Sequence, residues 1–228
     1  MEDKLANIKE LLLKKSATKQ LAYKSTYQVF NMLKVAAKEI AEKLSQEIDS
    51  ASSRVEIKYY EKGDYEMHLK FSGDTLVLMM HTNIFDFPPG HFIHSNPYIQ
   101  AEPMREFCGM IQIYNFLADS IKYNREGDLG YLVARVYVNK EQHLFIEGKR
   151  PLSFMFNDIG KCCINQESIN SILTEAMQYC LNFDLMAPPM EALSYISLEQ
   201  KNMMSYSSGM PTGKLLGFRS QANQDLPD

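Results

Sequence analysis

The residues best suited to chemistry gather in the stretch 81–98, which carries three histidines, one carboxylate and four aromatic rings. Imidazoles bind zinc and other transition metals, and aromatic rings with a few polar groups are typical of small-ligand pockets. Ordered loops longer than about 12–15 residues are often functional. We therefore interpret this stretch as a binding loop for a small ligand or a protein partner. The alternative is a packed connection whose aromatic side chains complete the core. Its candidate contact residues are His81, Phe85, Asp86, Phe87, His91, His94 and Tyr98.

A second group of residues has the types that bind a catalytic metal. Glu147 and Lys149 end an apolar segment that begins at His143, and Asp128 lies upstream. Over residues 127–149 this pattern resembles the (D/E)xK motif of the PD-(D/E)xK nuclease superfamily. The resemblance implies two carboxylates that hold a divalent metal and a lysine that helps to activate the attacking water.

Strand geometry argues against this nuclease centre. Alternating apolar residues predict a hairpin with a three-residue loop at 140–142, which pairs Ala134 with Gly148 and Arg135 with Glu147. Asp128 then lies about 23 Å from Arg135 along a strand that rises ~3.3 Å per residue. Ligands of one metal ion must lie within ~2–2.6 Å of it. We therefore predict that Glu147 forms a cross-strand ion pair.

The remaining motifs lack the spacing that their chemistry requires. Cys162 and Cys163 are adjacent and Cys108 and Cys180 are isolated, so no Cys-x-x-Cys pair is present. We predict that these thiols are buried, as small apolar side chains. Residues 209–215 have three residues between the glycines and a leucine after the lysine, which excludes a phosphate loop. No nucleophile elbow marks a serine or cysteine hydrolase.

Composition predicts a folded protein without an extended basic surface. Hydrophobic residues make up 45% of the 228 positions, which is sufficient for a core. Twenty-four basic and 28 acidic residues give a net charge of −4, so we expect no nucleic-acid partner and no anionic membrane. No apolar run approaches the ~20 residues of a membrane span, and no cleavable leader is evident. We expect a cytoplasmic location and no cofactor.

The N-terminal region is predicted to be helical. Residues 3–50 contain no glycine or proline, and from residue 29 the apolar positions recur at helical spacing. These positions are Val29, Leu33, Ala36, Ile40, Leu44 and Ile48. Leu5, Ile8 and Leu12 indicate an earlier helix, separated at residues 16–18, where Ser16 or Thr18 could cap the second one. Such stripes are typical of core or subunit contacts.

The next three segments alternate apolar and polar residues and predict an antiparallel meander. A loop at 61–63 pairs Tyr59 with Tyr65, and a turn at Gly73-Asp74 pairs Phe71 with Leu76. Both registers place all apolar residues on one face, which must be covered by another layer such as the long helix. The opposite face then carries Glu66, His68, Lys70, Val77, Met79 and His81, with Glu66 facing His81 and His68 facing Met79. Because two of these residues are apolar, we expect a cover, from the loop 84–105 or a second subunit, and we add His68 to the candidate contacts.

The remaining chain completes the fold. Four prolines exclude a central strand from 84–105. The segment 107–122 fits either a strand or a helix, and we expect a strand at its start. A further hairpin follows, and 166–182 is predicted to be a helix capped by Asn165. A short helix is expected after Pro188-Pro189 and a flexible tail over 207–228.

We therefore predict one α+β domain over residues 1–206, with a long N-terminal helix on a mostly antiparallel sheet of about six strands in two meanders and a C-terminal helix. The function that we predict is a non-catalytic binding or assembly protein. It would use the 81–98 loop and the adjacent sheet face for a protein partner or a small ligand, and a homo-oligomer is one such partner. The alternative is a metal-dependent hydrolase, nuclease-like around Glu147 and Lys149 or based on a histidine metal site.

Overall fold

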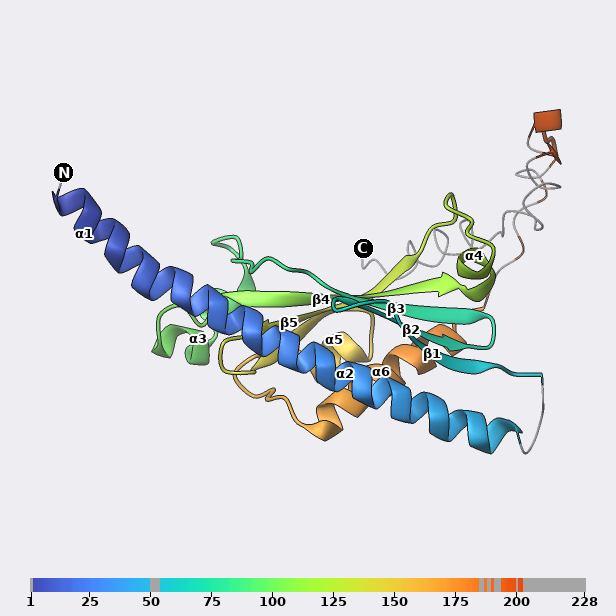
Figure 1. Ribbon diagram of the computed structural model, residues 1–228, viewed down its shortest axis with the longest axis horizontal. Helices are drawn as coiled ribbons and strands as arrows, with labels where there is room; N and C mark the ends of the chain where they lie inside the picture. Colours follow the sequence, from blue (N-terminus) through green and yellow to red (C-terminus); the bar gives the residue numbers. More distant parts are fainter. Residues whose placement is uncertain are drawn as a thin grey trace.

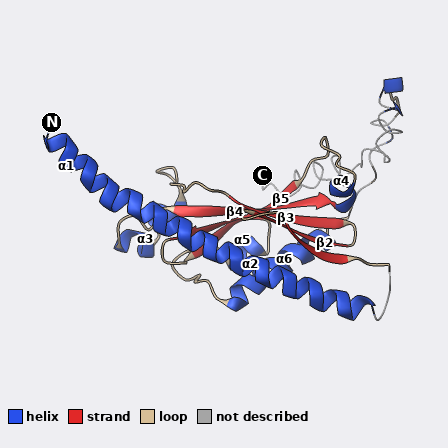
Figure 2. Ribbon diagram, in the orientation of Figure 1, coloured by secondary structure: helices blue, strands red, loops and turns tan. Residues whose placement is uncertain are grey.

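Six antiparallel strands in chain order form one sheet, and two long helices cover one of its faces (Figures 1 and 2). This arrangement is seen in a computed structural model that describes residues 2–49, 54–184, 187, 190, 194–199 and 201–202. The strands are β1 (Ile57–Glu61), β2 (Glu66–Phe71), β3 (Asp74–Met80), β4 (Cys108–Leu117), β5 (Tyr131–Asn139) and β6 (Leu144–Gly148). The predicted α+β class is confirmed, and the two predicted meanders are one continuous meander.

The helices account for most of the remaining described chain. The N-terminal ones are α1 (Glu2–Leu11), a π-helical turn η1 (Leu12–Ser16) and α2 (Ala17–Asp49). The later ones are the 3₁₀-helix η2 (Phe92–Ser95), α3 (Pro97–Ala101), α4 (Ala118–Lys122), α5 (Leu152–Met155) and α6 (Gln166–Leu181). Within the described ranges, every helix is too short or too polar to cross a bilayer. The helix predicted after Pro188-Pro189 is described only at residues 190, 194–199 and 201–202, and the predicted tail from 207 falls wholly outside the described residues.

The N-terminal helix is one uninterrupted rod that extends past the sheet (Figure 1). The predicted break at residues 16–18 is wrong, because Leu11 and Ala17 both keep right-handed helical dihedrals on either side of the π-helical turn. The predicted stripe from Val29 to Ile48 packs into the core. Leu5, Ile8 and Leu12 instead remain 58%, 51% and 59% exposed.

The first two hairpins keep the predicted faces but differ from the predicted pairing. Tyr59 pairs with Leu69, and Phe71 pairs with Asp74. The predicted pairs of Tyr59 with Tyr65 and Phe71 with Leu76 are therefore wrong. The predicted pairs of Glu66 with His81 and His68 with Met79 are wrong too, because Glu66 pairs with Met79 and His68 with Val77. In the first turn, positive φ falls on Gly63 at +116°, and the Lys62 N–H donates to the Glu66 carbonyl (3.1 Å). In the second turn, positive φ falls on Ser72 rather than on the glycine that follows it. Each shift is an even number of residues, and such shifts leave every side chain on its original face.

The third hairpin agrees with its prediction at each pair. Ala134 lies opposite Gly148, Arg135 opposite Glu147, and Tyr137 opposite Phe145. The segment 107–122 is strand β4 followed by the short helix α4. It is therefore a strand at its start, as expected.

The main core lies between the inner face of the sheet and the two helices α2 and α6. Among its fully buried side chains are Phe30, Leu33, Leu69, Leu78 and Ile113. Burial of a side chain of this size contributes ~1.5–3 kcal/mol. Helix α6 begins, as predicted, at a cap: the Asn165 side chain accepts the Ser168 N–H, and the Ser168 hydroxyl accepts the Asn165 N–H. The other, outer face of the sheet is therefore not covered by α2 or α6.

Candidate functional site

The outer face of the sheet divides into two halves. The segment 81–105 lies over strands β4, β5 and β6, and we call this the covered half. Of the residues that the structure describes outside the sheet, the short helix α4 lies over one end of strands β1, β2 and β3, and we call this the open half. The sequence-predicted candidates are divided between the two, because His68 lies in the open half and the others lie in the segment that covers the other half.

The aromatic residues of the segment 81–105 form a second, smaller core. Phe87 stacks on His91 with ring centroids 4.6 Å apart and meets Tyr137 edge-on at 5.1 Å. Phe145, which is fully buried, contacts both Phe87 and Tyr137. Phe85 exchanges two backbone hydrogen bonds with Cys108 (2.8 and 3.0 Å). These residues tie the segment to the sheet, as in the packed-connection alternative.

The three histidines of this segment each have a different partner. His91 Nε2 lies 3.0 Å from Glu147 Oε1, and His94 Nε2 donates to the Phe87 carbonyl at 3.2 Å. His81 Nδ1 accepts the Asn83 N–H at 2.9 Å. Nowhere in the described residues do three or more histidine, cysteine or acidic side chains gather as metal ligands. The structure therefore does not bring these imidazoles to one point.

The polar candidates of the segment also make contacts within the chain. Asp86 accepts the Phe87 N–H at 2.9 Å. The Tyr98 hydroxyl donates to Glu141 (2.7 Å) and accepts from the Asn139 amide (2.9 Å). Burial, with the Glu141 carboxylate beside it, raises the pKa of the Tyr98 hydroxyl. Tyr98 therefore ties the segment to the hairpin of β5 and β6, whereas the Asp86 contact is local.

The residues of the nuclease-like pattern are likewise held in separate contacts. Glu147 pairs with Arg135 at 2.6 Å, which is the cross-strand ion pair that the register predicts. Asp128 accepts from the Ser120 hydroxyl at 2.5 Å and lies 3.9 Å from Arg125. The two carboxylates therefore belong to different local networks.

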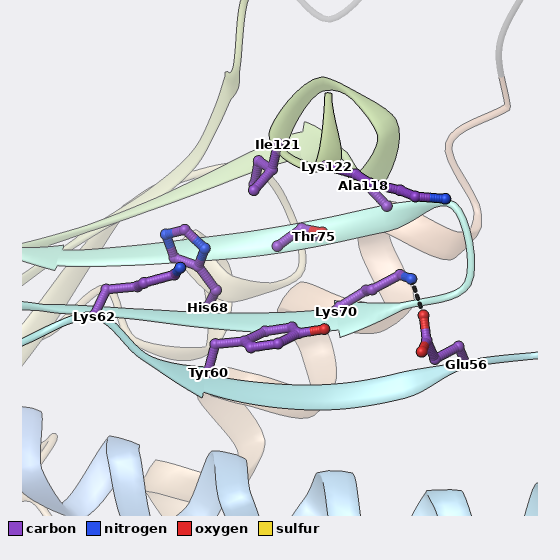
Figure 3. A pocket seen from close by; sticks show the side chains of 9 residues that line it. All are labelled: Glu56, Tyr60, Lys62, His68, Lys70, Thr75, Ala118, Ile121 and Lys122. Carbon is purple, nitrogen blue, oxygen red and sulfur yellow. Dashed lines mark hydrogen bonds and ion pairs between the residues drawn. The ribbon is translucent and has the colours of Figure 1, made fainter. Parts of the chain in front are cut away.

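A depression of about 480 Å³ lies on the open half, between the strands and α4 (Figure 3). Alternation along the strands directs His68 and Lys70 of β2 and Thr75 of β3 to the outer face, and Lys70 pairs directly with Thr75. Helix α4 forms one wall, because the chain turns back over the sheet directly after β4. The residues around the depression are Glu56, Tyr60, Lys62, His68, Lys70, Thr75, Ala118, Ile121 and Lys122.

The depression is positively charged although the chain is acidic overall. Three lysines and one glutamate line it, which leaves two positive charges, whereas the whole chain carries −4. Hydrogen bonds from Lys58 and Lys70 lower the pKa of the Glu56 carboxyl to about 2, so this residue is ionised at neutral pH. Lys62 lies over the Tyr60 ring, with its ammonium 5.9 Å from the ring centroid. An anion is the ligand that such a surface attracts.

Sequence reasoning found part of this site. The alternation placed His68 and Lys70 on the outer face, as the structure has them. The contributions of Tyr60, Lys62 and Lys122 were missed, because they depend on the first-turn register and on the position of α4. The expected cover also differs in place: the segment 81–105 covers strands β4–β6, whereas Val77, which is buried, lies outside the cluster that this segment forms.

No family model, curated protein or solved structure matches this chain.

Proposed function

We propose that this protein is a non-catalytic binding protein that takes a small anionic ligand, bearing carboxylate or phosphate groups, in the depression on the open half. The observation that carries the proposal is that Lys62, Lys70 and Lys122 all line one concave surface. The site lies on the sheet face next to the 81–98 segment, and that segment itself serves to cover the other half.

The geometry favours binding of an anion over binding of a metal. Lysine ammonium groups are donors only, and they attract carboxylates and phosphates as point charges. The strands hold Lys70 and Thr75 on a rigid surface, which limits the entropy lost on binding. Lys70 already pairs with Glu56, so a ligand oxygen would compete with that carboxylate. The Glu56 side chain thus sets how much of the lysine charge is available.

The test is titration with citrate as the probe, followed by calorimetry and by amide chemical shifts. We expect shifts to cluster at Thr75, Ala118 and Lys122. A Lys70→Met/Lys122→Met double variant should weaken binding about fivefold or more, since each exposed charge pair contributes ~0.2–1 kcal/mol. The matched control is Lys24→Met, which removes an exposed lysine from α2, the helix on the opposite face of the sheet.

Glu56→Gln provides the opposite test of the same site. Removing this carboxylate releases Lys58 and Lys70 from their ion pairs, and we expect citrate to bind about two- to fivefold more tightly. Tighter binding from the loss of an acidic residue is not expected from non-specific damage to the fold. If Glu56→Gln and the double lysine variant both bind citrate like the wild type, the depression is not the site.

The second candidate function is self-assembly, and the exposed apolar side of α1 favours it. We propose that two copies pair through this helix in antiparallel orientation, with the two-fold axis between Ile8 and Lys9. Leu5 then lies opposite Leu12 of the partner subunit, so the apolar stripe of one copy meets the same stripe of the other, as a self-complementary interface requires.

Sedimentation velocity tests this pairing. The wild type should sediment as a dimer, and Ile8→Glu, which places a charge in the apolar stripe, should sediment as a monomer. Asn7→Glu is the matched control, because it adds the same charge on the opposite side of α1. A monomeric wild type, or equal behaviour of the two variants, would refute the pairing and leave the anion site untouched.

A further inference from the structure

A cysteine and a histidine face each other at the start of β6, far along the chain from the lysines of the depression. His143 forms an isolated antiparallel bridge with Cys163, which lies between α5 and α6. The Leu144 N–H donates to the Cys162 carbonyl (2.9 Å), and the Ile164 N–H donates to the Gln142 carbonyl (3.0 Å). Hydrogen bonds on both flanks make this a non-hydrogen-bonded pair, the kind in which opposite side chains lie closest.

The hydrogen bonds of His143 decide which ring nitrogen carries the proton. Its Nδ1 lies 2.7 Å from the Ile159 carbonyl, which can only accept, so Nδ1 is the donor. In the neutral ring Nε2 then has a free lone pair, and Cys163 Sγ lies 3.2 Å from it. The thiol proton is therefore directed at a base.

The imidazole is fixed in this orientation by its surroundings. The Tyr98 ring stacks on it with centroids 4.3 Å apart and an interplanar angle of 14°. The His143 backbone N–H donates to the Asn139 side chain at 3.0 Å, and Asn139 is fully buried. A ring that is held by a carbonyl on one nitrogen and a stacked phenol on one face needs little reorganisation to accept a proton.

The adjacent cysteine lacks this arrangement. Cys162 is half-buried, its Sγ lies 4.0 Å from the Met155 carbonyl, and burial raises the pKa of its thiol. Cys163 is exposed, so the prediction of buried thiols holds for Cys108 and Cys180 and is wrong for this pair. The antiparallel bridge is the cause, because neighbouring residues in an extended segment point to opposite sides.

We infer that Cys163 is a nucleophilic thiol with His143 as its general base, and that it undergoes thiol–disulfide exchange with small disulfides. His143 Nε2 takes the thiol proton, and the thiolate attacks one sulfur of the disulfide. A bond between Cys163 Sγ and that sulfur forms as the original S–S bond breaks. The other sulfur leaves as a thiolate and receives the proton, so Cys163 is oxidised and one thiol is released.

Disulfide exchange suits this site better than acyl transfer. Acyl transfer requires hydrogen-bond donors for a developing oxyanion. The two amides that flank the pair, those of Leu144 and Ile164, already donate to carbonyls of the bridge. Exchange requires only a thiolate and an accessible sulfur.

The experiment uses the full chain and oxidised glutathione, with the mixed disulfide at Cys163 followed by intact-mass spectrometry. Cys162→Ser leaves Cys163 as the exposed thiol, and Cys163→Ser leaves Cys162. We expect Cys163 to react at least about tenfold faster than Cys162, and His143→Gln in the Cys162→Ser background to remove about tenfold or more of that rate. The pH profile should lose an inflection in the His143→Gln variant. The charged groups nearby are Asp158 and Lys161, which pair at 3.3 Å, and Glu141, which Tyr98 and Arg105 hold.

Two outcomes would overturn the inference. One is an equal rate and pH profile with and without His143 in variants whose circular dichroism matches the wild type. The other is a Cys162 that reacts as fast as Cys163, and this comparison leaves His143 unchanged, so it decides the question even if His143→Gln does not fold.

Discussion

The covered and open halves of the outer face consist of the same kind of antiparallel ladder, yet their outward-facing side chains differ in type and in packing. In the covered half, Tyr137 and Phe145 are opposite each other and stack at 4.9 Å under the segment 81–105. In the open half, the corresponding outward positions carry His68, Lys70 and Thr75. The first set packs into the smaller core, and the second lines the depression, in which His68 and Thr75 are buried and the Lys70 side chain is 20% exposed.

This difference indicates how to read a stretch that is rich in functional residue types. The segment 81–98 holds most of the histidines and many aromatic rings, but its side chains contact one another and the sheet. The lysines around the depression are ordinary in composition and become a candidate site through their placement on one surface. Residue type identifies possible chemistry, and accessibility decides between structure and binding.

The largest expected contrast is in stability after removal of a ring from each half. Phe145→Ala removes a fully buried ring that contacts Phe87 and Tyr137, and should lower the free energy of unfolding by ~3–5 kcal/mol. Tyr60→Ala removes a ring that is 40% exposed and should cost less than about 1 kcal/mol. Urea unfolding followed by circular dichroism measures both. Equal losses would show that the open half is as tightly packed as the covered half.

A smaller contrast in stability is expected when one carboxylate in each half is replaced by an amide. Glu147→Gln weakens the contacts to Arg135 and His91 in a partly buried setting, and should lower stability by ~1 kcal/mol. Glu56→Gln should lower the urea midpoint less than Glu147→Gln does, because the Glu56 side chain is 45% exposed and the Glu147 side chain 26%. A double-mutant cycle with Arg135→Met separates the Glu147 pair from other effects. A large loss of stability in Glu56→Gln would mean that Glu56 holds the edge of the sheet together.

Much of this architecture follows from side-chain periodicity. Along β5 and β6 the period of two, together with a three-residue loop at 140–142, predicts each pair, including Arg135 with Glu147. Periodicity alone does not fix the pairing register of the first two hairpins, since a shift of two or four residues keeps every side chain on its face. Turn chemistry then decides, and positive φ at Ser72 is not signalled by its residue type.

The candidate sites depend on contacts that periodicity does not describe. The alternation places Lys70 and His68 together, but the wall that α4 forms depends on where β4 ends. The pair of His143 and Cys163 depends on a bridge between two segments about 20 residues apart, one of which is irregular. No local pattern in the sequence marks such a bridge. Its register is set by two backbone hydrogen bonds and by the packing of α5, which lies in the chain between the two bridged segments.

The smallest predicted effects on stability come from the titration of one ionisable group in each half. Glu56 has a pKa lowered from 4.5 to about 2 by its lysine hydrogen bonds, so its contribution to stability is present above pH 4.5 and is lost as pH falls toward 2. Burial, with Glu147 nearby, raises the pKa of Tyr137 from 10.0 to about 12, so its contribution is complete below pH 10 and is lost as pH rises toward 12. Carbon-13 NMR of the Glu56 carboxyl and the Tyr137 phenol carbon measures both titrations. Glu56 should therefore titrate in acid and Tyr137 in alkali, with salt shifting the Glu56 midpoint more than the Tyr137 midpoint because exposed pairs are screened. A Tyr137 phenol that titrates near its ordinary pKa would show that water reaches the ring beneath the segment 81–105, and the distinction between the halves would fail.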